Sequence, residues 1–448
     1  MSHSPRIFFC RTPLGRTIRH IISIQYLTVK GKGNLDDTAY ILPLCVKDRF
    51  TNREKRAILC AVKRNLNASY ALYLSLYWMS ACFVYGYTRL FLGRLGFSAD
   101  EVGLLLALDS AAAMVLQPLL ARAIDRSVRL SLRLMLAAMC LAVLFSGGLL
   151  LIPQPKAVLV CLFAAMSTMT MAIQPFVNAV GFGYMNRGER LNWSATRGVA
   201  SMAFAVISKV YAALAERDMN YLLEMYLLFT AGMLIMSLIL AEKDAQTAGP
   251  RGGVKRSSLF RSYPAFFGML LGAVLIFFQH NFLDAYLYDV IVSVGGDTRE
   301  LGTALLIGAL VETPMMFLFS RVRGRFGAGR VLRISVALMG LKPWLILLTG
   351  SVWGVYLMRF SHFFSFAPFL LALTYYGNER MAEDEKVTGQ ALITGAISLS
   401  GVFSYLFGGM LVTGCGALRA LLICTLIGMA GSALFLLFAF RDQQQAKA

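Results

Sequence analysis

The chain has 448 residues, of which 57% are hydrophobic and only 15% are charged. A soluble domain carries about a quarter charged residues, so this composition and the mean hydropathy of +0.63 exclude a water-soluble globular protein and indicate a chain that lies in lipid. The formal net charge is +19. Lys and Arg fall mainly between apolar stretches, as they do in the loops of a membrane protein. The charge therefore does not predict a nucleic-acid partner.

The eight cysteines show no C-x-x-C pair and no metal-ligand spacing with histidine. We interpret them as reduced side chains that fill space, and no metal or other cofactor is expected. The sequence also lacks a nucleophile motif and a phosphate-binding loop, which disfavours an enzyme.

Residues 1–66 form a basic segment that lacks the apolar core of a signal peptide. We interpret this N-terminal extension either as a disordered cytoplasmic tail or as the product of a wrongly assigned start codon. The membrane pattern begins only near Asn67.

Windows of about 20 mostly apolar residues predict the membrane-spanning helices. They cover 68–91, 101–122, 130–152, 156–181, 193–215 and 220–241, and then 263–290, 300–320, 330–350, 352–377, 387–412 and 416–440. The expected fold is an all-α polytopic membrane protein with about twelve transmembrane helices in two six-helix halves. The halves are residues 67–242 and 263–441, the polar stretch 243–262 is a cytoplasmic linker, and 442–448 is a tail.

Basic residues alternate between the loops on the two sides. Arg122, Arg126, Arg129 and Arg133 surround the loop after the second helix, whereas the loops on the opposite side carry one or two basic residues each. The positive-inside rule then places both termini in the cytoplasm, as an even number of helices requires. The expected location is the cell (inner) membrane, crossed many times.

Polar side chains occur within the predicted helices, although an ionised group at membrane depth costs at least about 3 kcal/mol. They are the acids Asp109, Asp284, Asp289 and Glu312, the bases Arg197, Lys209, Lys342, Arg359 and His362, and the amides Gln174, Asn178, Gln279, Asn281 and Gln390. Such a set is stable if it lines an internal polar cavity, which predicts a path for a polar solute. Fixed ion pairs between helices are the alternative for any single residue. For Lys209, snorkelling toward a helix end is favoured.

Two sequence spacings place a histidine next to a charged side chain. Arg359 and His362 are three residues apart and His280 and Asp284 are four apart, so each pair shares a helix face. Histidine titrates near neutral pH. A group of histidine and carboxylate side chains that faces a cavity therefore provides the groups that proton-coupled transport needs.

Aromatic side chains form a stripe on the first helix. Tyr70, Tyr73 and Tyr77 lie roughly on one face. They either stack on a sugar or base ring in the cavity or belong to an interfacial belt.

Four segments together resemble the major facilitator superfamily, in the branch of lactose permease-like sugar:proton symporters and nucleoside:proton symporters. They read QPLLARAIDR at 117–126, NWSATRGVAS at 192–201, ETPMMF at 312–317 with RFG at 325–327, and LMRFSHFFSF at 357–366 with TGQA at 388–391. The second is similar to the R-x-x-G-S segment of the fifth helix, with Ala200 at the position where the family usually has glycine. The last is similar to the H-x-x-S-F segment of the tenth helix. The resemblance runs from Asn67 to Phe440.

The resemblance implies roles for the solute-binding residues. Arg197 matches the family's sugar-binding arginine, whose guanidinium holds paired ring hydroxyls. The carboxylate that usually partners it in the fourth helix is replaced here by Gln174.

The resemblance also implies roles in proton coupling. Asp284 matches one acid of the seventh helix, and Asn281 takes the place of the other. Lys342 lies near the family's arginine of the ninth helix. His362 matches the histidine of the tenth helix, but the acid expected three residues later is Ser365. Coupling of the lactose type is therefore not expected, and Glu312 or Asp109 is the candidate for the proton.

The expected function is secondary transport by alternating access, namely proton-coupled symport of an oligosaccharide, glycoside or nucleoside. The candidate solute-binding residues are Arg197, Gln174, Asn178, Asn281 and Tyr77. The candidate proton-coupling residues are Glu312, Asp284, Asp109, His362, Arg359 and Lys342. The expected partners are the solute, protons and the lipid bilayer, with no nucleic acid, and the expected state is a monomer.

Two alternatives remain open at this point. One is an efflux transporter for drugs or metabolites. The other is a sensor of transporter fold that binds a solute without moving it, in which the extension of residues 1–66 would be a signalling segment.

Overall fold

The computed structural model describes residues 65–126, 131–241, 263–380 and 386–445. The expected extension up to residue 64, the expected linker 243–262 and the last three residues of the tail lie outside these described residues.

The described part of the chain is almost entirely helical, and its elements fall into two consecutive sets. The N-terminal set comprises α3 (Leu66–Cys82), the π-helix η1 (Phe83–Tyr87), α4 (Thr88–Arg94), α5 (Ala99–Arg126), α6 (Leu132–Leu150), α7 (Lys156–Asn186), α8 (Trp193–Ala215) and α9 (Asn220–Leu240). The C-terminal set comprises α11 (Pro264–Ala285), α12 (Leu287–Ser293), α13 (Thr298–Phe326), α14 (Ala328–Leu341), α15 (Trp344–Thr349), α16 (Val352–Phe360), the 3₁₀ turn η2 (Ser361–Phe363), α17 (Phe366–Arg380), α18 (Lys386–Cys415) and α19 (Ala417–Gln445).

Eleven helical spans in the described part are long and apolar enough to cross a membrane. The remaining predicted helix, 68–91, corresponds to α3, η1 and α4 in succession. Its longest α-helical stretch has only 17 residues because the π-helical turn interrupts it. The chain is therefore a multi-pass, all-α membrane protein, as its hydropathy predicts.

Three of the predicted helices in the C-terminal set are broken. The predicted helix 263–290 divides into α11 and α12 at Tyr286, and the helix 330–350 divides at Pro343. The helix 352–377 is interrupted by η2, just before Pro368. Proline lacks the N–H that would continue the helix and its ring clashes with the preceding turn. These breaks matter for the site, because they place Lys342 and His362 at helix ends inside the protein.

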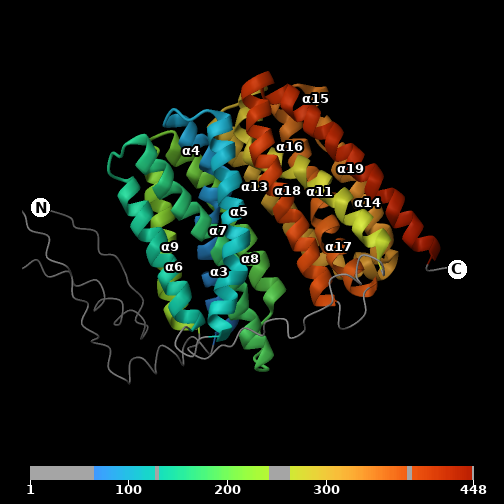
Figure 1. Ribbon diagram of the computed structural model, residues 1–448, viewed down its shortest axis with the longest axis horizontal. Helices are drawn as coiled ribbons and strands as arrows, with labels where there is room; N and C mark the ends of the chain where they lie inside the picture. Colours follow the sequence, from blue (N-terminus) through green and yellow to red (C-terminus); the bar gives the residue numbers. More distant parts are fainter. Residues whose placement is uncertain (1–64, 127–130, 242–262, 381–385, 446–448) are drawn as a thin grey trace, which may run out of the picture. The chain divides into compact units, whose positions relative to one another are not determined.

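The helices of each set pack mainly on one another, and the two sets meet chiefly along two helix pairs. These pairs are α5 with α18 and α8 with α13. Figure 1 shows α5 and α18 next to each other between the N-terminal helices, in blue to green, and the C-terminal helices, in yellow to red.

Small residues allow this close approach at one end of the helices, where α5 begins and α18 ends. A Cβ atom on Gly409 would lie 2.6 Å from the carbonyl oxygen of Ala99, and one on Gly302 would lie 2.5 Å from the Cβ of Ala212. Glycine lets two helix backbones come this near inside a membrane. We call this the closed end.

Polar contacts between the two sets gather at the closed end. Arg89 Nη2 lies 2.6 Å from Asp289 Oδ1, and Arg299 Nε lies 2.6 Å from Glu216 Oε1. Thr413 on α18 donates to Asp100 on α5 at 2.8 Å. These contacts hold the two sets together where the close helix crossings are.

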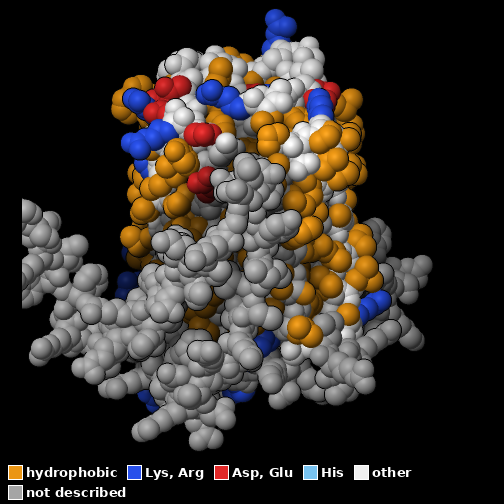
Figure 2. Space-filling view, turned by 90° about the vertical axis from the view of Figure 1, so that its left-hand side faces the viewer, with side chains coloured by type: hydrophobic (Ala, Val, Ile, Leu, Met, Phe, Trp, Pro, Cys, Tyr) orange, Lys and Arg blue, Asp and Glu red, His pale blue; other side chains and the backbone are white. Residues whose placement is uncertain are grey.

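Large apolar side chains on the outside face the lipid. Phe145, Trp353 and Leu348 are 71%, 72% and 78% exposed. Figure 2 shows hydrophobic side chains along the two flanks of the visible face, with charged side chains gathered near its upper end. This distribution matches a bilayer with water beyond it.

Candidate functional site

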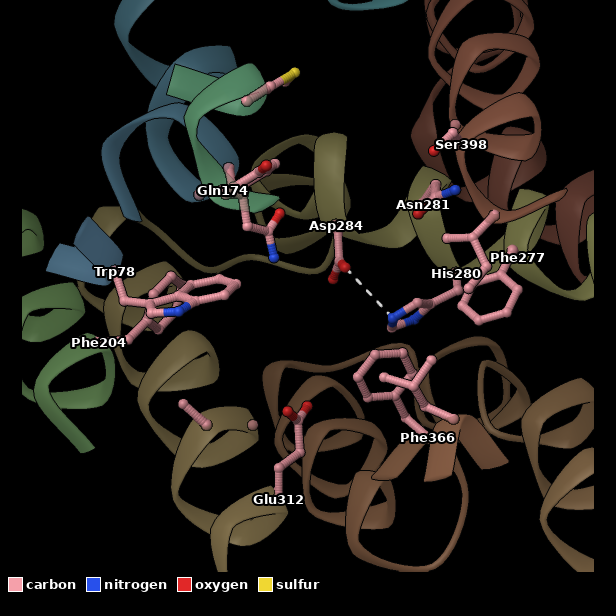
Figure 3. Close-up of a pocket in the computed structure, with 18 of the residues that line it drawn as sticks. Trp78, Gln174, Phe204, Phe277, His280, Asn281, Asp284, Glu312, Phe366 and Ser398 are labelled. Carbon is pink, nitrogen blue, oxygen red and sulfur yellow. Dashed lines mark ion pairs between the residues drawn. The ribbon is translucent and has the colours of Figure 1, made fainter. Parts of the chain in front are cut away.

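A cavity of about 480 Å³ lies between the two helix sets. On one side it is lined by α3, η1, α5, α7 and α8, and on the other by α11, α13, α16, η2, α17 and α18. Figure 3 shows Trp78 and Phe204 on one side, His280 and Phe366 on the other, and Glu312 pointing in from α13.

The wall formed by the N-terminal set, the N-wall, is aromatic and carries one charge. The guanidinium carbon of Arg197 lies 4.1 Å from the centre of the Trp78 ring, within cation–π distance. Its Nη1 donates a hydrogen bond of 2.8 Å to Ser201, one helical turn along α8. The Trp78 ring meets Phe204 edge to face at 6.3 Å. Arg197 is thus held in a fixed position against an aromatic surface.

The wall formed by the C-terminal set, the C-wall, carries the acids of the cavity. Arg359 Nη1 donates to Asp284 Oδ1 at 2.9 Å, and His280 Nε2 lies 3.5 Å from the other carboxylate oxygen. Arg359 is almost fully buried, whereas the Asp284 side chain is 40% exposed. The ion pair therefore joins a buried base to an acid that faces the cavity.

A second acid pairs with histidine on the same wall. Glu312 on α13 lies 2.9 Å from Nδ1 of His362 in η2, and its side chain is 20% exposed. Gly308, one turn before Glu312, makes room for the bases opposite, because a Cβ there would lie 3.3 Å from Cδ of Arg359 and 3.8 Å from Nδ1 of His362.

Lys342 connects the two histidines behind the cavity surface. Its amino group lies 3.0 Å from Nδ1 of His280 and 3.3 Å from Nε2 of His362. A protonated lysine has only donors, so both of these ring nitrogens accept. The remaining ring N–H groups then face the carboxylates, from His280 toward Asp284 and from His362 toward Glu312.

The result is one continuous line of five side chains, which we call the relay: Asp284, His280, Lys342, His362 and Glu312. Both of its ends open on the cavity, and the Phe366 ring packs against its middle, 4.2 Å from the His280 ring. Three of its links are hydrogen bonds and the fourth, from His280 to Asp284, is an ion-pair contact at 3.5 Å. A line of two histidines and two carboxyl groups can take up, hold and pass protons.

Some of the predicted site residues do not line the cavity. Asp109 is buried between α5 and α7, where Ser167 and Thr168 donate to its carboxylate. Tyr77 is fully buried and donates to the carbonyl of Thr170 at 3.4 Å. Asn178 lies one helical turn beyond the cavity-lining Gln174.

Other intramembrane polar residues fix helices in place. Lys209 contacts the hydroxyl of Thr303, Asp289 pairs with Arg89, and Gln279 donates to the carbonyl of Met339 at 2.9 Å. The side chain of Gln390 lies outside the described residues. Asn281 does line the cavity, and its buried Nδ2 has no hydrogen-bond partner among the described residues.

Sequence reasoning left three site residues out of its candidate set. His280 enters the sequence analysis only as a neighbour of Asp284. Trp78 and Phe204 do not stand out in the sequence from the many other aromatic residues. A short-range spacing in the sequence could not predict the link from His280 to Lys342, because the two positions are 62 residues apart. Trp78 follows Tyr77, and one residue turns a helix by about 100°, which decides which ring faces the cavity.

No group of three His, Cys, Asp or Glu side chains that could hold a metal ion occurs in the described part of the chain. The polar groups of the cavity instead suit a small polar solute.

An all-helical membrane protein with two helix sets and a polar cavity between them has the architecture of a membrane transporter. The MFS_1 like family matches residues 67–422, and the chain belongs to this family of the major facilitator superfamily. The expected fold and superfamily are thus confirmed, and family and fold point to a transporter.

Individual relatives are distant. The maltose permease of Geobacillus stearothermophilus is 26% identical over 355 residues, which cover 77% of this chain and 87% of the permease. Crystal structures of a variant of the nucleoside transporter NupG and of an inward-facing bacterial homologue of the lysosomal transporter Spinster superpose with TM-scores of 0.66 and 0.60. They are 15% and 13% identical, and the alignments cover 84% and 87% of this chain and 100% and 98% of theirs. Such structures show the shared fold.

Proposed function

We propose that this transporter is a proton-coupled symporter of a small polar solute that contains a sugar or similar ring. The observation that carries the proposal is the relay, which joins two cavity-facing carboxyl groups through His280, Lys342 and His362. A binding site alone does not need buried charge behind its surface, because burying ionised groups is costly.

Glu312 is the proposed proton acceptor. It faces the cavity, where water reaches it, and it is hydrogen bonded to His362 at 2.9 Å. Arg359 and His362 are proposed to couple the events: Arg359 is paired with Asp284 in this structure, and protonation at either end of the relay changes which partner it favours. Asp109, between α5 and α7, is a second candidate for carrying a proton.

The N-wall is the proposed solute site. Arg197 and Gln174 lie where they can bond ring hydroxyls, and Trp78 and Phe204 offer a surface for a ring. Asn281, on α11 of the facing C-wall, can bond the same solute from the other side. Tyr77 meets Trp78 edge to face at 5.4 Å and supports it, and Asn178 extends the polar face of α7. The names of the similar proteins, a maltose permease and a nucleoside transporter, support a sugar or nucleoside solute.

Alternating access is proposed to open and close the two ends in turn. The glycine crossings and the Arg89–Asp289, Arg299–Glu216 and Thr413–Asp100 contacts hold one end closed. We propose that this end is external, that both termini are cytoplasmic, and that the protein works as a monomer in the cell membrane. Arg122, Arg133 and the arginines at 321–333, which the structure describes at the other end, support this orientation.

The test is alkalinisation of a lightly buffered suspension of cells that overproduce the protein, on addition of sugars, glycosides or nucleosides. One solute is expected to raise the pH, and Glu312→Gln is expected to abolish the rise. The matched control is Glu224→Gln, at an exposed acid on α9, which should leave it intact. Solute binding without any pH change would sink the symport proposal and favour a sensor or an uncoupled carrier.

A further inference from the structure

We propose that the transported solute carries a carboxylate, and that Arg197 binds this group while Trp78 and Phe204 pack against the solute's ring. The inference rests on the proposed function, because it names the chemical class of the solute in the same cavity. It starts from the hydrogen bonds and charges of Arg197.

Arg197 lines the cavity with most of its donors uncommitted. A guanidinium has five N–H donors, and the described residues provide one acceptor, the hydroxyl of Ser201 at 2.8 Å. One face of the group is covered by Trp78. Within the described part of the chain, no carboxylate lies within ion-pair distance of Arg197. Gln174, which lines the same wall from α7, is neutral.

The acids of the cavity already have other partners. Asp284 is paired with Arg359 at 2.9 Å, and Glu312 is bonded to His362 at 2.9 Å. Among the described groups that line the cavity or the relay behind it, three cationic side chains (Arg197, Arg359 and Lys342) stand against these two acids, with His280 and His362 neutral because both accept from Lys342. A solute with a single negative charge would balance the set.

A carboxylate suits this position better than a hydroxyl pair. Arg197 and a carboxylate can form two parallel, charge-assisted hydrogen bonds, which are roughly twice as strong as neutral ones. Desolvating a cation without an anion is costly, so a solute that covers Arg197 binds more favourably if it brings an anion. The Trp78 and Phe204 rings then receive the apolar face of the solute's ring.

The same arrangement would link proton and solute. Glu312 and Arg197 both line the cavity. Glu312 also interacts electrostatically with Asp284, Arg359 and Lys342, and it contacts the His362 ring. Protonation of Glu312 removes a negative charge that attracts Arg197. The guanidinium is then more available to bind the carboxylate of the solute. Each ligand thereby favours binding of the other.

The experiment uses two matched pairs of probes on the purified full-length protein: p-nitrophenyl β-D-glucuronide with the glucoside, and p-nitrophenyl β-D-galacturonide with the galactoside. Members of a pair differ only by a carboxylate in place of a hydroxymethyl group. In calorimetric titration at least one acid is expected to bind about tenfold more tightly than its neutral partner. Arg197→Gln should abolish this preference, Arg197→Lys should restore it in part, and Arg217→Gln, at an exposed arginine following α8, should leave it unchanged.

Three results would overturn the carboxylate assignment: failure of both acids to bind, equal or tighter binding of the neutral members of both pairs, or an acid preference that survives in Arg197→Gln. Alkalinisation assays separate this failure from that of the proposed function. Neutral compounds that raise the pH while the acids do not would leave symport standing. Acids that bind through Arg197 and are taken up without proton movement would support the assignment and overturn the symport.

Discussion

The two walls of the cavity have unlike chemistry although they belong to one fold. The N-wall presents rings, amides and the single base Arg197, whereas the C-wall presents both acids of the cavity. The polar groups of the N-wall lie at the surface of the cavity, where they are accessible to a ligand. The C-wall continues inward as the relay, through a lysine that the cavity does not reach.

This difference underlies the proposed division of roles, in which recognition of the solute and energy coupling occupy opposite sides of one cavity. A solute lying between the walls contacts both, so its binding and the protonation of the C-wall influence each other without a separate pathway. Damage to one wall should alter mainly the property assigned to that wall, which the following predictions test.

The largest effect is expected at the centre of the relay. Lys342→Met removes the amino group that bonds both histidines, so no donor joins the two carboxylate ends. Proton-driven uptake should fall about 100-fold or more, the size of effect that follows loss of a proton-transferring group. Solute binding to the N-wall should persist in titrations on purified protein.

The matched control for this prediction is Lys209→Met, since Lys209 bonds Thr303 near the closed end and takes no part in the relay. Driven uptake by Lys342→Met at a level close to that of the unchanged protein would show that the relay carries no proton.

The N-wall should give the opposite result. Trp78→Ala removes the ring that supports Arg197 and is proposed to stack on the solute. Affinity should fall about tenfold, since aromatic stacking contributes about 1–3 kcal/mol. The number of protons taken up per solute should not change, as measured by alkalinisation together with labelled uptake at saturating solute.

Trp353→Ala is the matched control, because this tryptophan is 72% exposed on the outer surface. If Trp78→Ala changed the proton-to-solute ratio and not the affinity, the division of labour between the walls would be wrong.

A smaller effect is expected where the walls are joined. Gly409→Ala places a methyl group 2.6 Å from the Ala99 carbonyl oxygen and forces α5 and α18 apart at the closed end. In a background without native cysteines, a reporter at Ala99→Cys should react severalfold faster with a membrane-impermeant maleimide. Gly414→Ala on the same helix meets nothing within 4 Å and should not change the rate. Equal rates in both variants would mean that this crossing does not set the closure.

The smallest effect concerns the helix that carries Glu312. Asp297 caps the start of α13, and its hydrogen bonds with Glu300 and the backbone N–H of Arg299 hold the pKa of this carboxyl below its ordinary value of 3.8. Asp297→Ala should lower stability by about 1 kcal/mol, measured by thermal unfolding in detergent near neutral pH. Because the folded-state pKa is depressed, the contribution is present above the ordinary value and is lost as the pH falls through the lowered one. A difference between the proteins that persists unchanged at still lower pH would contradict this role.

Much of the fold follows from local sequence. A run of about 20 apolar residues has to be a helix in lipid, since its backbone polar groups have no other partners. The predicted helices accordingly match the observed ones closely, for instance 193–215 against α8, Trp193–Ala215. The breaks near Tyr286 and Ser361 were not predicted, because they depend on packing and on a proline several residues away.

The candidate site was partly predictable, through charge inside apolar segments. Arg197, Asp284, Glu312 and His362 were found this way, since an ionisable group at membrane depth needs an internal polar surface. The rule gives depth and residue type but no partner. It therefore grouped Asp109 with these residues, although Asp109 bonds to α7 outside the cavity lining.

By itself the sequence determined that this protein crosses a membrane many times and that polar groups lie inside it, because hydropathy and desolvation act residue by residue. Only the tertiary structure decided that Lys342 stands between His280 and His362, which are 62 and 20 residues away from it. It likewise decided that Trp78 faces the cavity and Tyr77 does not. Those choices depend on how helices rotate and break against one another, and such contacts between distant parts of the chain leave no local trace.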